Sequence, residues 1–509
     1  AVGRQRAHLR RTARTGMIGH EAVAVLKAMI FADLAFLRDG KRFEKSLEYN
    51  LARLAKFVKR YVGQPDFAEL HKLIEKLLAA FGLTRPEELV GVVYRGCDRP
   101  ALAALARCLA GQDSAGAYYL IAVPTQWNGH LVLHAHGGPA LGAPRPERSA
   151  ADLERWAIMV KAGYAWAGST FRQGGVEVRA AAEDTERLRQ IFVGHVAQPR
   201  RTILHGQSWG ASVAARGAEM FTSTTQGQRP YDAVLLTSGV LAGGSRSYDF
   251  RTDLRVVYQY LCNNHPRPTE VQYPLNIGLP ADATLTQADL AVRVNECLGL
   301  DKPASARTPE QQRRVKVITD VIRIPASSIQ GHMNWATFHF RDVVQHRTGG
   351  ASPFGNEGVR YRGSDDDAAL NAGVLRYRAH PAALARFAQD TDPTGRIPVP
   401  VLTAKGIDDA TAFVELDAAF KTTMEQAGTS GHLVQTFTRH SSHSYLSDPT
   451  YPTLMAALLR WVEDGTRPTP ASIASECPAL EATFGKGCAF VPEYRPAALN
   501  TRVPERAPQ

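Results

Sequence analysis

The sequence predicts an α/β fold in which a mostly parallel sheet carries helices on both faces. Short, continuous apolar stretches read as buried strands, and they alternate with helix-forming stretches. The alternation stops after residue 238 and resumes at Val399. The predicted strands are Tyr118–Pro124, His130–Ala135, Tyr164–Ala167, Thr202–Leu204, Ala233–Thr237, Val399–Gly406 and His432–Thr438.

Residues 1–90 differ from the rest of the chain. Apolar side chains recur there at three- and four-residue spacing, which is typical of amphipathic helices. The predicted helical stretches are His20–Leu37, Lys41–Val62 and Phe67–Phe81. We expect an N-terminal basic helical segment in which no chemistry is identified.

The interruption of the alternating pattern sets the remaining domain boundaries. A structureless loop of that length is implausible inside a compact domain, so residues 241–397 are predicted to form an inserted lid domain. Residues 91–240 and 398–468 are then the two parts of the α/β core, and the proline-rich residues 469–509 are an irregular tail. Asp365, Asp366 and Asp367 within the lid lack the further ligands of a calcium loop, and a solvated turn or helix start is favoured.

Composition narrows the choice of partners. The formal net charge is +11, and part of the excess lies in the arginines of residues 4–14. A solvated arm is favoured over a nucleic-acid contact, because no zinc-finger spacing or aromatic single-strand motif accompanies it. No apolar run approaches the ~20 residues of a membrane helix, so no membrane span is expected.

Six cysteines fall in three pairs that are close in sequence: Cys97/Cys108, Cys262/Cys297 and Cys477/Cys488. None has the C-x-x-C spacing of a metal or redox site. Six cysteines allow 15 connectivities, and local pairing is the economical one. Disulfides and a chain that starts at Ala1 without methionine favour a secreted or periplasmic protein, with a trimmed chain as the alternative.

The central motif is G-x-S-x-G, formed by Gly206–Gly210 between a predicted strand and a predicted helix. In that context the pentapeptide indicates a nucleophile elbow. The glycines permit a tight turn that exposes Ser208 at a helix N-terminus, where developing negative charge is favoured. By itself the motif also occurs by chance.

A serine nucleophile needs a base, and the base needs a carboxylate that orients it. The chain supplies both in the order Ser, Asp, His, each just after a predicted strand. Asp409 is preferred over Asp408 because it lies three residues past the turn glycine Gly406. His443 is preferred over His440 because it lies further into its loop and just before the last core helix.

An oxyanion hole requires backbone N–H groups. Trp209, the residue after the nucleophile, should provide one. The second should come from Gly138 or Gly137 in the sequence HGGP, because Pro139 has no N–H.

The elbow, the HGGP loop and the Ser-Asp-His order together resemble an α/β-hydrolase-fold serine hydrolase, from about Tyr118 to Trp461. The Trp127-Asn128-Gly129 turn, the long lid and the closing sequence Trp461–Gly465 loosely resemble secreted tannase-like or feruloyl-esterase-like bacterial esterases. Two positions depart from the usual pattern: Trp209 is bulky, and Ser442 replaces the glycine that commonly precedes the histidine.

The resulting hypothesis is a serine-dependent carboxylic ester hydrolase that works through an acyl-enzyme and needs no metal or organic cofactor. The lid contains several arginines and the aromatic residues Trp335, Phe338, Phe340 and Tyr361. These side chains favour aromatic or hydroxyacid esters or polyester oligomers as substrates. One alternative is a serine aminopeptidase of the same fold, with Asp365–Asp367 as an acidic recess. The other is a non-catalytic binding protein on a hydrolase scaffold. The oligomeric state is left open.

Overall fold

A computed structural model describes residues 93–96, 102, 104–224 and 227–506. It divides the chain into two compact units, residues 1–112 with 191–198, and residues 113–190 with 199–509. In the first unit, β1 (Val93–Gly96) and β2 (Ala106–Gln112) pair antiparallel. The helices predicted within residues 1–90 lie outside the described residues, as does Cys97.

The second unit contains a mixed sheet with the order β3-β5-β4-β6-β7-β8-β9. β3 runs antiparallel to β5, and each later neighbour pairs parallel. The predicted strands are present with boundaries shifted by up to three residues: β3 (Tyr118–Pro124), β4 (His130–Ala135), β5 (Ala165–Ser169), β6 (Arg201–Gln207), β7 (Ala233–Thr237), β8 (Val401–Gly406) and β9 (Leu433–Thr438).

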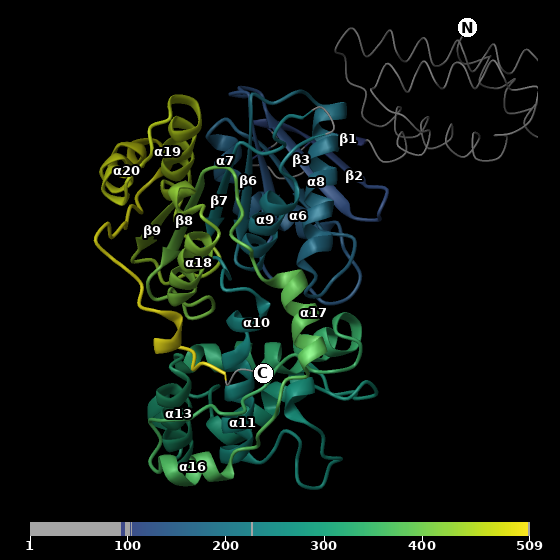
Figure 1. The fold of residues 1–509 in the computed structure, drawn as a ribbon, viewed down its shortest axis with the longest axis vertical. Helices are drawn as coiled ribbons and strands as arrows, with labels where there is room; N and C mark the ends of the chain where they lie inside the picture. The colour runs from purple at the N-terminus through teal and green to yellow at the C-terminus, as the bar shows by residue number, and fades with distance from the viewer. Residues whose placement is uncertain (1–92, 97–101, 103, 225–226, 507–509) are drawn as a thin grey trace, which may run out of the picture. The chain divides into compact units, whose positions relative to one another are not determined.

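Helices cover both faces of this sheet (Figure 1). Neighbouring residues of a strand point to opposite faces. On β6, Leu204 lies below Gly217 of α9 (Trp209–Met220), whereas His205 packs edge-on against Tyr451 of α19 (Thr450–Asp464). Strands β4, β7 and β8 are buried along their whole length, as expected for a parallel sheet enclosed by helices. The other core helices are α6 (Glu147–Arg155), α7 (Ala157–Lys161), α8 (Val178–His195) and α18 (Glu415–Gln426).

The segment between β7 and β8 consists of helices joined by loops and forms the lower part of Figure 1. Its longest helices are α11 (Asp249–Cys262), α12 (Gln287–Leu298), α13 (Pro309–Ile322) and α17 (Pro381–Thr391). Between them, residues 329–347 form one almost continuous helical stretch, α14 (Ile329–Asn334), the π-helix η6 (Trp335–His339), α15 (Phe340–Asp342) and the π-helix η7 (Val343–Arg347). Shorter elements are α10 (Gly244–Ser247) and α16 (Asp367–Gly373).

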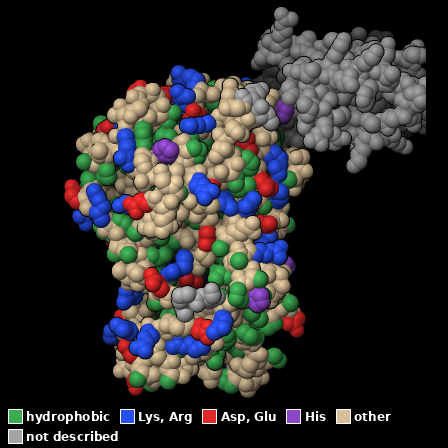
Figure 2. All heavy atoms as spheres, in the orientation of Figure 1, with side chains coloured by type: hydrophobic (Ala, Val, Ile, Leu, Met, Phe, Trp, Pro, Cys, Tyr) green, Lys and Arg blue, Asp and Glu red, His purple; other side chains and the backbone are tan. Residues whose placement is uncertain are grey.

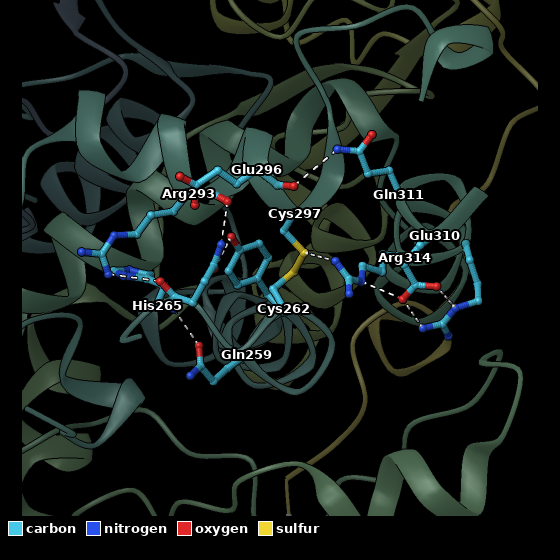
Figure 3. The surroundings of a disulfide bond; sticks show 12 residues. Gln259, Cys262, His265, Arg293, Glu296, Cys297, Glu310, Gln311 and Arg314 are labelled. Carbon is cyan, nitrogen blue, oxygen red and sulfur yellow. Dashed lines mark hydrogen bonds and ion pairs between the residues drawn. A yellow bond between two sulfur atoms is a disulfide. The ribbon is translucent and has the colours of Figure 1, made fainter. Parts of the chain in front are cut away.

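A disulfide fixes this helical segment internally. Cys262 at the end of α11 joins Cys297 of α12, with a Cα–Cα distance of 5.7 Å. Figure 3 shows Arg314 of α13 directed at the Cys297 sulfur, at 3.6 Å, while its other side reaches Glu310. Cys477 and Cys488 form a second disulfide. Two of the three predicted pairs are therefore confirmed.

The tail after Pro468 is not irregular throughout, contrary to the prediction. Helix α20 (Pro470–Phe484) occupies its first part. Thr469 forms a capping box with Ser472, and Pro470 stands at the first turn, where its missing N–H costs nothing. The prolines that suggested irregular structure therefore include one that starts a helix, and Pro478 is tolerated inside it.

Charged side chains of both signs lie on the surface of the described residues. On the face drawn in Figure 2, Lys and Arg side chains are interspersed with Asp and Glu. Among the described helices, none combines the length and apolarity that crossing a bilayer would require.

Candidate active site

Ser208 occupies a sharp turn between β6 and α9. Its φ of 57° and ψ of −122° are a backbone conformation that non-glycine residues rarely adopt. Three backbone hydrogen bonds hold the turn: Ser208 donates to the Thr237 carbonyl (3.0 Å) and accepts from the N–H groups of Val240 and Ala211 (both 3.1 Å). The turn therefore has the strained strand-to-helix geometry of a nucleophile elbow.

The flanking glycines are required by close backbone contacts. A Cβ on Gly206 would lie 2.2 Å from the Gly210 carbonyl oxygen. A Cβ on Gly210 would lie 2.0 Å from the carbonyl oxygen of Ala135, at the end of β4. Any side chain at either position would push the elbow apart, so the turn requires glycine at both positions.

The structure brings Ser208, His443 and Asp409 together over distances of 235 and 34 residues in sequence. His443 Nε2 lies 2.7 Å from Ser208 Oγ, and His443 Nδ1 lies 2.7 Å from Asp409 Oδ2. Asp409 follows β8 and His443 follows β9, so both loops lie at the carboxyl edge of the sheet, where β6 also ends. This is the geometry of nucleophile, base and orienting acid.

Each member of this group is held by further contacts. Asp409 is 2% exposed, and its Oδ1 accepts the N–H groups of Thr411 (2.8 Å) and Ala412 (2.9 Å). The side-chain amide of Gln207 donates to the His443 carbonyl at 3.0 Å. The Ser208 side chain is buried, whereas the His443 side chain retains 18% exposure. The imidazole therefore lies where both the serine and solvent can reach it.

The two alternative residues lie elsewhere. Asp408 is exposed and is not the residue that contacts His443. His440 points to the C-terminal region, with its Nε2 3.0 Å from the carbonyl oxygen of Gly487. Burial lowers its pKa.

The HGGP loop lies against the elbow. A Cβ on Gly137 would lie 2.0 Å from Gln207 Oε1, whereas a Cβ on Gly138 would meet no atom within 4 Å. Gly138 has a φ of 69°, which favours glycine. The loop therefore packs on β6 through Gly137 and faces open space at Gly138.

The carbonyl of Gly137 is held on one side, by the guanidinium of Arg148 and by His136 Nδ1 (3.1 Å). In a trans peptide the C=O and the following N–H point in opposite directions, so the Gly138 N–H is directed away from Arg148. Trp209 begins α9, and the first N–H groups of a helix have no helical acceptor. Burial and the charge of Arg148 lower the pKa of His136 to about 3, so its ring is neutral.

The helical segment between β7 and β8 contacts both loops of the site. His339 Nε2 donates to the Pro139 carbonyl at 2.9 Å, and His332 Nε2 donates to the Ala410 carbonyl at 2.9 Å. Burial lowers the pKa of His332 to about 3 and that of His339 to about 4. Both rings therefore remain neutral donors at neutral pH.

Below the site, a buried ion pair supports the elbow. Lys405 Nζ of β8 lies 2.5 Å from Asp417 Oδ2 and donates to the Gly239 carbonyl at 2.6 Å. Gly239 precedes Val240, whose N–H binds the Ser208 carbonyl. The sequence analysis did not identify this lysine, because a single Lys inside an apolar strand is expected to lie at the edge of the sheet or to be exposed.

The strand order, the antiparallel β3 and the elbow after β6 define an α/β-hydrolase fold. Within the described residues, no group of three His, Cys, Asp or Glu side chains is arranged to hold a metal ion.

Comparison with known proteins gives structural similarity only. No protein-family model matches the sequence, and no curated protein matches it. Among solved structures, feruloyl esterase B from Aspergillus oryzae aligns with 12% identity and a TM-score of 0.38, over 74% of this chain and 86% of that one. The rice cell wall degrading esterase LipA from Xanthomonas oryzae aligns with 13% identity and a TM-score of 0.34, over 74% and 90%. An esterase from Pyrococcus furiosus aligns with 11% identity and a TM-score of 0.34, over 76% and 93%.

Proposed function

We propose that this protein is a serine-dependent carboxylic ester hydrolase that works through an acyl-enzyme. The observation that carries the proposal is the unbroken path of hydrogen bonds from Asp409 through His443 to Ser208. It supplies a nucleophile, a base in contact with it and a buried carboxylate that fixes the base.

In the proposed reaction, Ser208 Oγ attacks the ester carbonyl while its proton moves to His443 Nε2. Asp409, with its second oxygen already occupied by two N–H groups, stabilises the imidazolium that forms. The Trp209 and Gly138 N–H groups stabilise the oxyanion of the tetrahedral intermediate. His443 then gives its proton to the leaving alcohol, and water attacks the acyl-enzyme by the same route in reverse.

We assign residues 241–397 the role of a lid that selects the substrate, and aromatic or hydroxyacid esters, including polyester oligomers, are the substrate class we propose. His332 of this segment donates to the carbonyl of Ala410, the residue after Asp409, and His339 donates to the carbonyl of Pro139 in the HGGP loop. Of the aromatic residues that suggested this class, Phe338, Phe340 and Tyr361 are buried in the packing of the segment itself. Trp335 is partly exposed and is the one that supports an aromatic contact.

The peptidase alternative needs an acidic recess for a substrate amine. Asp365 pairs with Arg313, Asp366 caps α16 through the Ala369 N–H, and Asp367 accepts from Ser364. Each carboxylate is therefore already engaged within the helical segment, and no observation at the site favours a peptidase. The two disulfides of the described region support a secreted or periplasmic location.

The test is hydrolysis of p-nitrophenyl esters and aminoacyl-anilides by wild type, Ser208→Ala, His443→Gln and His440→Gln. We expect kcat to fall about 10⁶-fold in Ser208→Ala and His443→Gln, as in other triads. His440→Gln is the matched control on the same loop and should stay within a few-fold of wild type.

Three results would contradict the proposal in different ways. Full esterase activity in pure Ser208→Ala protein would remove the serine from the mechanism. Cleavage of anilides in preference to esters would make the protein a peptidase. Silence on all substrates, together with failure of Ser208 to react with a fluorophosphonate, would leave a binding protein on a hydrolase scaffold.

A further inference from the structure

Arg251 of α11 is a buried cation whose charge has no anionic partner among the residues that the structure describes. The residue is 4% exposed. Its Nε has no hydrogen-bond partner, and one terminal nitrogen reaches the Ser247 carbonyl one turn earlier, at a long 3.4 Å. Five donors in a fixed fork are therefore almost unused.

Three aromatic rings surround the guanidinium. Its Cζ lies 4.6 Å from the ring centre of Phe250, 4.7 Å from that of Trp335 and 5.2 Å from that of Tyr248. The rings of Tyr248 and Trp335 themselves lie 4.1 Å apart. Rings attract a cation through their faces and leave the edge of the guanidinium, which carries its N–H groups, without an acceptor.

Arg506 provides an internal comparison. Its side chain is 11% exposed, and it lies 3.0 Å from Asp253 and 3.6 Å from Asp249. These carboxylates raise the pKa of Arg506, whereas burial lowers the pKa of Arg251 to about 10. Among the described residues, two carboxylates of α11 thus neutralise Arg506, whereas Arg251 has no carboxylate partner. Within the same part of the chain that the structure describes, Arg255 of α11 also lacks a carboxylate partner and donates to Thr337 Oγ1 instead. An uncompensated buried charge is costly, so the N–H groups of Arg251 are available to donate to an incoming anion.

The aromatic cage lies between the two loops of the proposed active site. On one side, His332 packs edge-on against Phe250 (4.9 Å) and donates to Ala410, the residue after Asp409. On the other side, His339 stacks on Trp335 (4.8 Å) and donates to Pro139 of the HGGP loop. Trp335 and His339 are partly exposed, so this wall of the cage is accessible to solvent.

We propose that Arg251 binds a carboxylate group of the ester substrate, so that the enzyme selects esters that carry a free carboxylate in addition to the ester bond. This inference rests on the proposed function and names the substrate class of the same site. The cage supplies apolar walls for the substrate, and the guanidinium supplies paired N–H donors for the carboxylate. A buried ion pair of this kind is specific, because a neutral analogue would leave the charge unpaired.

The test compares pairs of esters that differ in charge and little else. With the carboxylate on the acyl side, the pair is p-nitrophenyl hydrogen glutarate and p-nitrophenyl hexanoate. With the carboxylate on the alcohol side, the pair is 4-acetoxybenzoate and 4-acetoxybenzamide. The proteins are wild type, Arg251→Met, Arg251→Lys and the control Arg255→Met, which removes another buried arginine of α11 that binds Thr337 instead.

We expect wild type to favour the charged member of at least one pair, and that pair identifies the side of the ester that faces Arg251. In Arg251→Met, kcat/KM for the charged ester should fall about 30-fold or more, as for a lost charge-assisted hydrogen bond, while the neutral ester changes little. Arg251→Lys should keep part of the preference. Arg255→Met should keep the wild-type ratio.

An equal charged-to-neutral ratio in wild type and Arg251→Met, with Ser208-dependent turnover intact, would overturn this inference and leave the proposed function standing. A binding measurement tests the inference even if the protein hydrolyses no ester. Benzoate titrated into Ser208→Ala protein should change the tryptophan fluorescence, to which Trp335 contributes, and benzamide should not. Retention of benzoate binding in Ser208→Ala/Arg251→Met protein, or its absence in Ser208→Ala protein, would also overturn the inference, whether or not any ester is hydrolysed.

Discussion

Replacement of Gly210 by alanine tests the close packing of the elbow. The added Cβ would lie 2.0 Å from the Ala135 carbonyl oxygen and 2.5 Å from the His136 carbonyl oxygen. Real Cβ atoms essentially never come within 3.0 Å of another atom, so α9 and the end of β4 must separate by about 1 Å. Both obstacles are backbone atoms, and no side-chain rotation relieves them.

The expected cost follows from this displacement. Overpacking a close-packed interior costs about 3 kcal/mol when backbone has to move. The same shift separates the Trp209 N–H from the HGGP loop, and a misplacement of ~1 Å in a catalytic group lowers kcat/KM about 100-fold. Urea unfolding measures the first effect, and p-nitrophenyl ester hydrolysis measures the second.

Gly217 on the same helix is the matched control. A Cβ there would meet Leu204 Cδ2 at 3.4 Å and Ala182 Cβ at 3.8 Å, which are ordinary contacts. Because alanine is a better helix former than glycine, Gly217→Ala should be neutral or stabilise by about 0.5–1 kcal/mol. A Gly210→Ala protein with wild-type stability and wild-type kcat/KM would refute the reasoning.

Three further predictions follow from the site. Asp409→Asn should keep the bonds from Thr411 and Ala412 but lower kcat about 10⁴-fold at neutral pH, because the amide favours the wrong tautomer of His443; an activity near wild type would exclude Asp409 as the orienting acid. Lys405→Met should cost about 3–5 kcal/mol in urea unfolding by leaving Asp417 buried and unpaired, and the double variant Lys405→Met/Asp417→Leu should recover most of this loss. The folded-state pKa of His332 is lowered to about 3, so below pH 6.5 the unfolded chain binds a proton that the folded chain does not. The free energy of unfolding should therefore fall by about 1.4 kcal/mol per pH unit between pH 6.5 and 4 through this residue alone. In His332→Gln, the slope of the unfolding free energy against pH should be smaller by that amount.

Short-range features of the chain were predicted well from the sequence. The strands of the core are fixed by continuous apolar stretches, and the cysteine pairs Cys262/Cys297 and Cys477/Cys488 are close in the chain. Elements without such patterns were missed or misjudged. Ala106–Gln112 contains no β-branched residue, and its strand was not predicted. In α20, Pro470 and Pro478 led to the prediction of an irregular tail, although a capping box starts a helix there.

The sequence by itself determined the α/β class, the elbow at Ser208 and the order of the candidate residues, because each depends on a few neighbouring residues and on the convergence of parallel strands at one edge. The tertiary structure alone decided which histidine contacts the serine and which aspartate contacts that histidine. A shift of one residue changes the direction of a side chain in a loop, and the periodicity of helices and strands does not extend into loops. It also decided that, among the described residues, Arg251 has no carboxylate partner while Arg506 has two. Whether a buried charge is paired depends on segments hundreds of residues apart, and only the folded chain brings them together.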